Sequence, residues 1–112
     1  MANEIENVLH ASARVNGLNA GAIVEASSGV VDASVVRQAP GDYLLTLTNG
    51  LAPSEAVCAT SIEGAAGPAA RRMTVLQASD TVFRILTFNA AEPAVAVDAV
   101  WSLSFFRAFT GP

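Results

Sequence analysis

The residues that most often carry catalysis or metal binding are few in this chain. It contains one histidine, His10, and one cysteine, Cys58. These two side chains would form a nucleophile and its base only if the fold brought them together, and a third orienting group would still be needed. A metal site at His10 would need Cys58 or carboxylates as its other ligands, because the sequence contains no His-x-x-x-His or Cys-x-x-Cys spacing. We therefore expect no metal site, and a small hydrolase using this pair is the least favoured function.

The other motifs of enzymes are also missing from the sequence. No serine lies in a Gly-x-Ser-x-Gly elbow, and no glycine-rich loop ends in the Lys-Ser or Lys-Thr that cradles phosphate. The ten carboxylates are dispersed along the chain, and no run alternates acidic ligands as a calcium loop does. The sequence therefore predicts a protein that is not an enzyme and that has no catalytic residues and no cofactor.

Two groups of residues are candidates for contact with a partner. Near the N-terminus, Ile5, Val8 and Leu9 offer apolar side chains that would anchor an otherwise mobile arm. The only adjacent pair of arginines, Arg71-Arg72, would clamp an acidic neighbour through bidentate pairing, or would simply be solvated.

A carbohydrate site is a further possibility, because sugars stack on exposed aromatic rings. Trp101 and Tyr43 are the candidates for such stacking besides the five phenylalanines. Trp101 lies in an apolar stripe, which favours a place in the core.

Charge is unusually scarce. Only 14% of the 112 residues are charged, and lysine is absent, whereas an ordinary soluble domain carries about 25% charged residues. Free monomers keep apart by charged surfaces, and sheet edges are commonly protected by lysine. Because this chain lacks both protections, we expect neighbouring polypeptides to cover much of its surface.

The sign of the charge excludes several partners. The net charge of −4 and the scattered arginines argue against nucleic acid, because phosphate contacts need clustered cations. No uncharged apolar run is long enough to span a membrane, and the acidic N-terminus is unlike a secretory signal. One cysteine allows no internal disulfide, which fits folding in a reducing compartment. We expect synthesis in the cytoplasm and binding to neither nucleic acid nor membrane.

The hydrophobic pattern is that of β-strands. Apolar residues alternate or form short runs, and turn residues interrupt them at short intervals, which is typical of a sandwich or barrel. We expect an all-β fold: a single-domain antiparallel β-sandwich, jelly-roll-like, of about seven or eight strands over residues 8–112, preceded by an N-terminal arm of residues 1–7. The predicted strands cover residues 8–15, 22–25, 30–37, 43–48, 56–62, 72–77, 81–88 and 95–109, with a long loop at 63–70.

Two segments show the alternation most clearly. In the last strand, the odd-numbered residues from Val97 to Phe105 form one apolar face, and the opposite face is mixed rather than charged. This pattern predicts a central strand that is covered on both sides or faces another subunit. Tyr43, Leu45 and Leu47 alternate in the same way. The Pro40-Gly41 dipeptide before Tyr43 predicts a type II turn that closes a hairpin.

The run from Ser34 to Leu47, SVVRQAPGDYLLTL, resembles a signature of small β-sandwich domains in the structural proteins of tailed bacteriophages. Those domains carry a Ser-Val-x-Arg strand, a glycine-containing turn, and then an aromatic residue followed by alternating β residues. A proline-containing connection and a strand of short residues follow, as in 51–60. Two closing strands come next, as in 81–88 and 97–107. The resemblance covers roughly Val30 to Arg107.

The resemblance implies a jelly-roll or immunoglobulin-like domain that serves as a capsid decoration (cement) protein or as a tail-fibre head. Because no stalk of coiled coil, collagen-like repeats or β-helix is visible, we expect the decoration type. The alternative is a tail-fibre or spike head that recognises a host receptor or glycan. The expected location is the capsid exterior of a virion. The expected partners are the major capsid protein or other virion proteins, with further copies of the chain in a homo-oligomer, a dimer or trimer.

Overall fold

The protein is an antiparallel β-sandwich, which confirms the predicted fold class. The computed structural model describes every residue except 1–4, 19–21, 64–69, 92 and 111–112, and for 5–7, 109 and 110 it describes the backbone only. Within this part of the chain, eight strands form two four-stranded sheets, and the only helical element is one short 3-10 turn, η1. No helix of the described residues is both long and apolar enough to cross a membrane.

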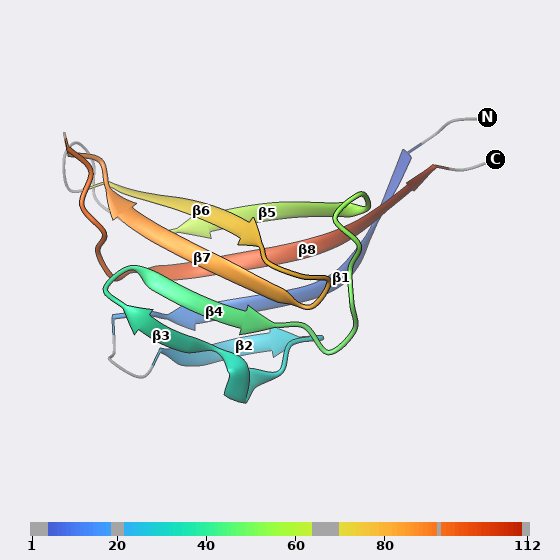
Figure 1. Ribbon diagram of the computed structural model, residues 1–112, viewed down its shortest axis with the longest axis horizontal. Helices are drawn as coiled ribbons and strands as arrows, with labels where there is room; N and C mark the ends of the chain where they lie inside the picture. The colour runs from blue at the N-terminus through green and yellow to red at the C-terminus, as the bar shows by residue number, and fades with distance from the viewer. Residues whose placement is uncertain (1–4, 19–21, 64–69, 92, 111–112) are drawn as a thin grey trace.

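Strand order decides which segments become neighbours (Figure 1). The first sheet has the order β2-β1-β8-β5 and the second β3-β4-β7-β6, so the first and last strands pair at the centre of the first sheet. The hairpins β1–β2, β3–β4 and β6–β7 stay within one sheet, and the remaining connections cross between sheets. The elements are β1 (Ile5–Asn16), β2 (Ile23–Ser28), η1 (Asp32–Ser34), β3 (Val36–Ala39), β4 (Asp42–Thr46), β5 (Ala56–Ile62), β6 (Arg71–Gln77), β7 (Val82–Asn89) and β8 (Val100–Thr110).

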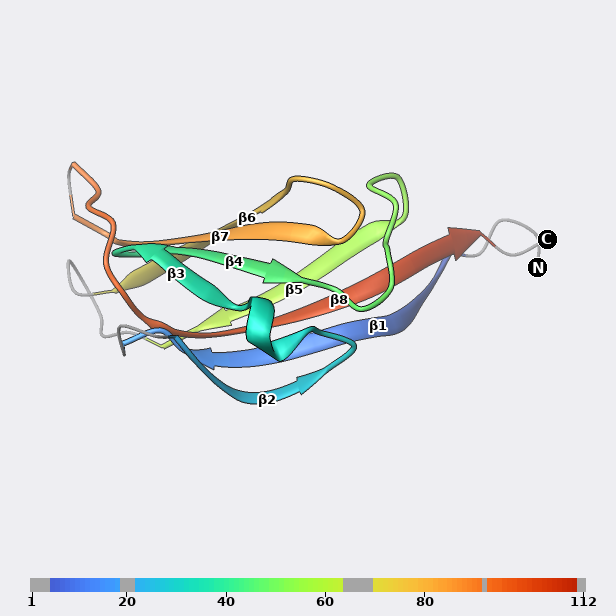
Figure 2. The same cartoon turned by 60° about the horizontal axis from the view of Figure 1, so that its bottom comes forward.

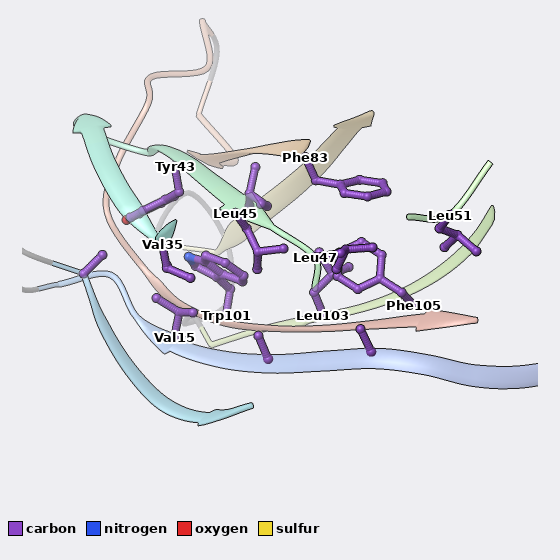
Figure 3. Close-up of a cluster of buried hydrophobic side chains, with 14 residues drawn as sticks. Val15, Val35, Tyr43, Leu45, Leu47, Leu51, Phe83, Trp101, Leu103 and Phe105 are labelled. Atoms are coloured by element: carbon purple, nitrogen blue, oxygen red, sulfur yellow. The ribbon is translucent and has the colours of Figure 1, made fainter. Parts of the chain in front are cut away.

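The core lies between the two sheets, as the turned view in Figure 2 shows. The predicted face of the last strand is confirmed, because Trp101, Leu103 and Phe105 are fully buried. From the second sheet, Tyr43 stacks at a tilt on Trp101 with ring centroids 5.5 Å apart, and Phe83 does the same on Phe105 at 4.6 Å (Figure 3). Alternation in β4 and β8 therefore placed the large apolar side chains correctly.

The hairpin between β3 and β4 is also confirmed, and Gly41 shows why its turn needs glycine. Its φ of +69° lies in the left-handed region, where side chains with a Cβ are disfavoured. A Cβ at this position would also lie 2.4 Å from the carbonyl oxygen of Thr87 in β7. The turn is thus held against the neighbouring strand as well as closed on itself.

Two predicted strands differ most from the structure, while β2 runs on to Ser28 and β4 ends at Thr46. Residues 30–37 do not form one strand: Val30 makes an isolated bridge, Asp32–Ser34 is η1, and β3 starts only at Val36. The Ser34 hydroxyl donates to the carbonyl of Val31, a local bond that competes with extended pairing. At the other end of the chain, β8 begins at Val100 rather than at residue 95.

The N-terminal boundary also shifts. β1 begins at Ile5, whose backbone pairs with Thr110 of β8. Residues 5–7 of the predicted arm therefore belong to the sheet, and the rest of the arm lies outside the described residues. Most of the predicted loop at 63–70 lies outside them too.

Candidate functional site

The structure does not assemble a catalytic pair from His10 and Cys58. His10 is the extra residue of a β-bulge in β1, between Leu9 and Ala11, and its Nε2 donates to the carbonyl of Asn49 at 2.9 Å. Cys58 lies in β5, and β8 separates β5 from β1, a lateral distance of about 10 Å for two strand spacings. Neighbouring groups crowd the exposed Cys58 thiol, and this desolvation raises its pKa. A raised pKa leaves the thiol protonated and weakly nucleophilic at neutral pH.

The described part of the chain contains no ligand pocket. In the same residues, no three side chains of His, Cys, Asp or Glu come close enough together to hold a metal ion. Surfaces that a second polypeptide could contact are the remaining candidates.

The most prominent such surface is a two-stranded ribbon that projects from the sandwich. It consists of residues 5–9 of β1 and 106–110 of β8, which pair from Ile5–Thr110 to Leu9–Phe106. Both views show it extending beyond the other strands, with the chain ends at its tip (Figures 1 and 2). We call these residues the β1–β8 ribbon.

The ribbon exposes two of the three apolar residues that the sequence singled out. Val8 is 49% exposed and Leu9 57% exposed. The third, Ile5, lies in the same ribbon, where only its backbone is described. Leu9 faces Phe106, and Phe106 faces Val57 of β5, so the three form an apolar row across the outer face of the first sheet. Sequence reasoning missed Phe106 and Val57, because their proximity to Leu9 depends on long-range strand order.

One edge of the ribbon lacks a partner strand. β2 pairs with β1 only from Ser12 to Asn16, and Gly29 lies against His10 and Ala11, so residues 5–9 of β1 have no strand beside them on that side among the described elements. Such an edge presents backbone N–H and C=O groups to any added strand. No lysine or proline protects it, and its exposed Val8 and Leu9 are apolar.

The base of the ribbon is held firmly. Glu55 accepts a hydrogen bond from Nε of Arg107 at 2.6 Å, and its carbonyl accepts one from the amide of Ala108 at 2.8 Å. On the other strand, the bond from His10 to Asn49 ties the bulge to the β4–β5 connection. The body thus positions the ribbon through contacts on both of its strands, which reduces the ordering cost of binding.

Arg71 and Arg72 lie elsewhere. They begin β6 opposite Asn89 and Phe88 of β7, at the end of the sandwich away from the ribbon (Figure 1). Arg72 is exposed and Arg71 is half-buried. The structure therefore does not join the two groups of candidate contact residues into one site.

The aromatic candidates for sugar stacking are part of the core. Trp101 and Tyr43 are both fully buried, so neither offers a ring face to a ligand. The loop considered for a receptor site, residues 63–70, lies mostly outside the described residues. No contact in the described part of the chain favours a glycan-binding head.

A polar cluster around Asp98 was not predicted. Its carboxylate accepts two bonds from Nε of Arg37 at 3.0 Å, one from the amide of Gly41 at 2.9 Å and one from the Tyr43 hydroxyl at 2.9 Å. Nη2 of Arg37 adds an ion pair at 2.9 Å. The segment before β8 is thereby fastened to β3, β4 and their turn. Arg37 is 61 residues from Asp98 in the sequence, so no local sequence pattern predicts that the two side chains pair.

The cluster also sets protonation states. Burial opposes ionisation of Asp98, but the bonds from Arg37, Gly41 and Tyr43 outweigh it and hold the pKa of Asp98 below its usual value. Burial and the nearby Asp98 carboxylate raise the pKa of Tyr43 to about 12. Tyr43 therefore stays protonated at neutral pH and able to donate. Since no pocket adjoins the cluster, its role is to hold the sandwich together.

Most arginines of the described residues are neutralised within the chain. Arg14 bridges Glu25 and Glu63, and Arg37, Arg84 and Arg107 pair with Asp98, Asp42 and Glu55, respectively. Exposed pairs of this kind contribute little to stability. Their consequence is a surface with small local fields, on top of a low total charge.

Comparisons with protein-family models, curated proteins and solved structures find no match to this chain.

Proposed function

We propose that this protein is a non-enzymatic structural protein of a bacteriophage virion, of the capsid decoration (cement) type. It binds the outer capsid surface, across boundaries between subunits of the major capsid protein, and stabilises the shell. The observation that carries the proposal is the β1–β8 ribbon, a projecting element with exposed Val8 and Leu9 and an open strand edge.

The neutral surface supports this assignment. The low charge content and the internal ion pairs leave little electrostatic repulsion against another protein. A freely diffusing protein benefits from a mixed charged surface with a net charge, whereas a permanently bound one does not need it. The low surface charge is therefore consistent with a protein that is permanently bound to a protein shell.

The ribbon suggests how attachment works. A strand of the capsid adds to the open edge of β1 at residues 5–9, and backbone hydrogen bonds supply affinity. Val8 and Leu9 enter apolar pockets of the partner and supply specificity. The base of the ribbon is held by Glu55 and by the bond from His10 to Asn49. The ribbon therefore loses little conformational freedom when the partner binds.

Stabilisation of the shell follows from linkage. A protein that binds only the assembled shell stabilises it by about 2.7 kcal/mol per site when its free concentration is a hundredfold above Kd. Many such sites around the shell resist internal pressure together. No chemistry is required of the bound protein.

We therefore expect particles that lack this protein to lose resistance to heat and osmotic shock. The measurement compares genome release from particles with and without the protein as temperature rises. Adding the purified protein back to deficient particles should restore resistance, and added albumin should not. Equal resistance of both particle types would contradict the proposed function.

A further inference from the structure

β5 is the edge strand of the first sheet on the side opposite β2. Its five central residues, 57–61, are all exposed. The strand reads AVCATSI and contains no charge, proline or glycine. Natural edge strands are usually short, charged, bulged or covered, and β5 has seven residues in unbroken register with β8. It is therefore an unprotected edge.

The backbone of β5 shows which of its groups are unpaired. The carbonyl of Glu55 accepts from Ala108, and the amide of Glu63 donates to the carbonyl of Val100. Because bonding alternates along an antiparallel ladder, the odd-numbered residues of β5 face β8. Cys58, Thr60 and Ile62 consequently direct their N–H and C=O groups away from the sheet. Ala56 offers only its C=O group, because its amide already donates to the carbonyl of Pro53 at 3.4 Å.

We propose that two copies of this chain associate through their β5 edges, antiparallel about a two-fold axis at Ala59, to form a continuous eight-stranded sheet. This register pairs Ala56 with Ile62 and Cys58 with Thr60 of the second copy, and all four outward-facing residues find partners. A shift by two residues in either direction pairs only three of them. The centred register is thus the only one of the three that engages every outward-facing residue of β5.

The chemistry of β5 suits a second copy better than a charged partner. A two-fold axis places each residue near its own equivalent, so like charges would repel. No residue of β5 is charged. The flanking Glu55 and Glu63, which face each other across the seam, each pair with an arginine of the same chain: Glu55 with Arg107, and Glu63 with Arg14, which also pairs with Glu25.

The apolar row on the outer face ends at the seam. Leu9, Phe106 and Val57 run across three strands to the β5 edge, and the second copy continues the same face. Two paired strands of seven residues bury less surface than a standard stable interface does. We therefore expect a dimer with a Kd on the order of 10 µM. The isolated protein tests this inference, which therefore does not depend on the proposed function.

Disulfide trapping tests the register. Ala59 and its equivalent form a non-hydrogen-bonded pair with Cα atoms about 4.5 Å apart, within reach of a disulfide. The Cys58→Ser/Ala59→Cys variant should cross-link under mild oxidation. Native Cys58, opposite Thr60 and about 7 Å or more from its equivalent, should cross-link poorly. The control is Cys58→Ser/Thr74→Cys, because Thr74 is exposed on β6 of the other sheet.

Sedimentation over a range of concentrations tests the edge itself. Thr60→Lys places a charge beside the seam and should weaken the dimer at least tenfold, whereas Thr74→Lys, with the same charge change, should leave it unaffected. Circular dichroism checks that both variants stay folded. The proposal is overturned by a wild-type monomer at about 1 mM, by equal effects of the two lysines, or by cross-linking at residue 59 no faster than at 74.

Discussion

Replacing Val8 and Leu9 together with aspartate should weaken binding to capsids at least a hundredfold while the sandwich stays folded. Full burial of an aliphatic side chain contributes about 1.5–3 kcal/mol. Because about half of each side chain is already buried, binding adds roughly half of this for each, and losing both removes about 1.5–3 kcal/mol, or about ten- to a hundredfold in Kd. The two carboxylates would also have to be desolvated against an apolar surface. Both side chains are about half exposed, so the substitution leaves the core intact.

A matched control is available on the other sheet. Val36 and Leu76 are 43% and 46% exposed, and their double aspartate variant makes the same change in charge and hydropathy. Co-sedimentation of each purified variant with capsids that lack the protein measures binding, and circular dichroism checks folding. If the two double variants bind capsids equally well, the ribbon is not the attachment site.

Removal of the Asp98 carboxylate should have the largest effect on stability. Asp98→Ala leaves Arg37, the Gly41 amide and the Tyr43 hydroxyl without their shared acceptor. Breaking a buried charge pair costs 3–5 kcal/mol, and Asp98 retains 21% of its side-chain surface, so we expect a loss of about 3 kcal/mol. Asp80→Ala, which removes an exposed carboxylate, should change the free energy of unfolding by about 0.5 kcal/mol or less. Urea unfolding at pH 7 measures both.

The same variant predicts a pH dependence. The pKa of Asp98 is lower in the folded protein than in the unfolded chain, so the unfolded chain takes up the proton first as pH falls. The stability from ionised Asp98 is fully present above the unfolded value of about 3.9 and is lost below it. The gap in unfolding free energy between wild type and Asp98→Ala should therefore narrow as pH drops below about 4. A gap that stays constant down to pH 2.5 would show that the charge of Asp98 does not matter.

Local patterns in the sequence predicted the strands and the core well. Period-two alternation identified the buried faces of β4 and β8, and Pro40-Gly41 identified the turn between β3 and β4. Both signals depend only on neighbouring residues, because the pleat and the turn are local geometries. They failed at residues 32–34, where Asp32 and Ser34 make local side-chain bonds that replace strand pairing.

Features that join distant segments were beyond such patterns. Asp98 looked like one polar residue on the outer face of a strand, and only the folded chain shows it bonded to Arg37 and Tyr43. The ribbon was predicted as a free arm with Val8 and Leu9 as contacts. The last strand was predicted, but its pairing with β1 was missed, because pairing of the first and last strands leaves no signal in a single sequence. The same holds for β5 as an unprotected edge, since its exposure depends on strand order.

The proposal that this sandwich works while bound to a viral shell can be tested by quantitative mass spectrometry of purified virions whose genome carries the gene for this chain. Capsids and tails are separated, and the amount of this chain is measured against that of the major capsid protein. We expect the chain in the capsid fraction, in a fixed ratio to the capsid protein and in comparable numbers. Its absence from virions, or a copy number typical of a tail component and confined to the tail fraction, would contradict the account.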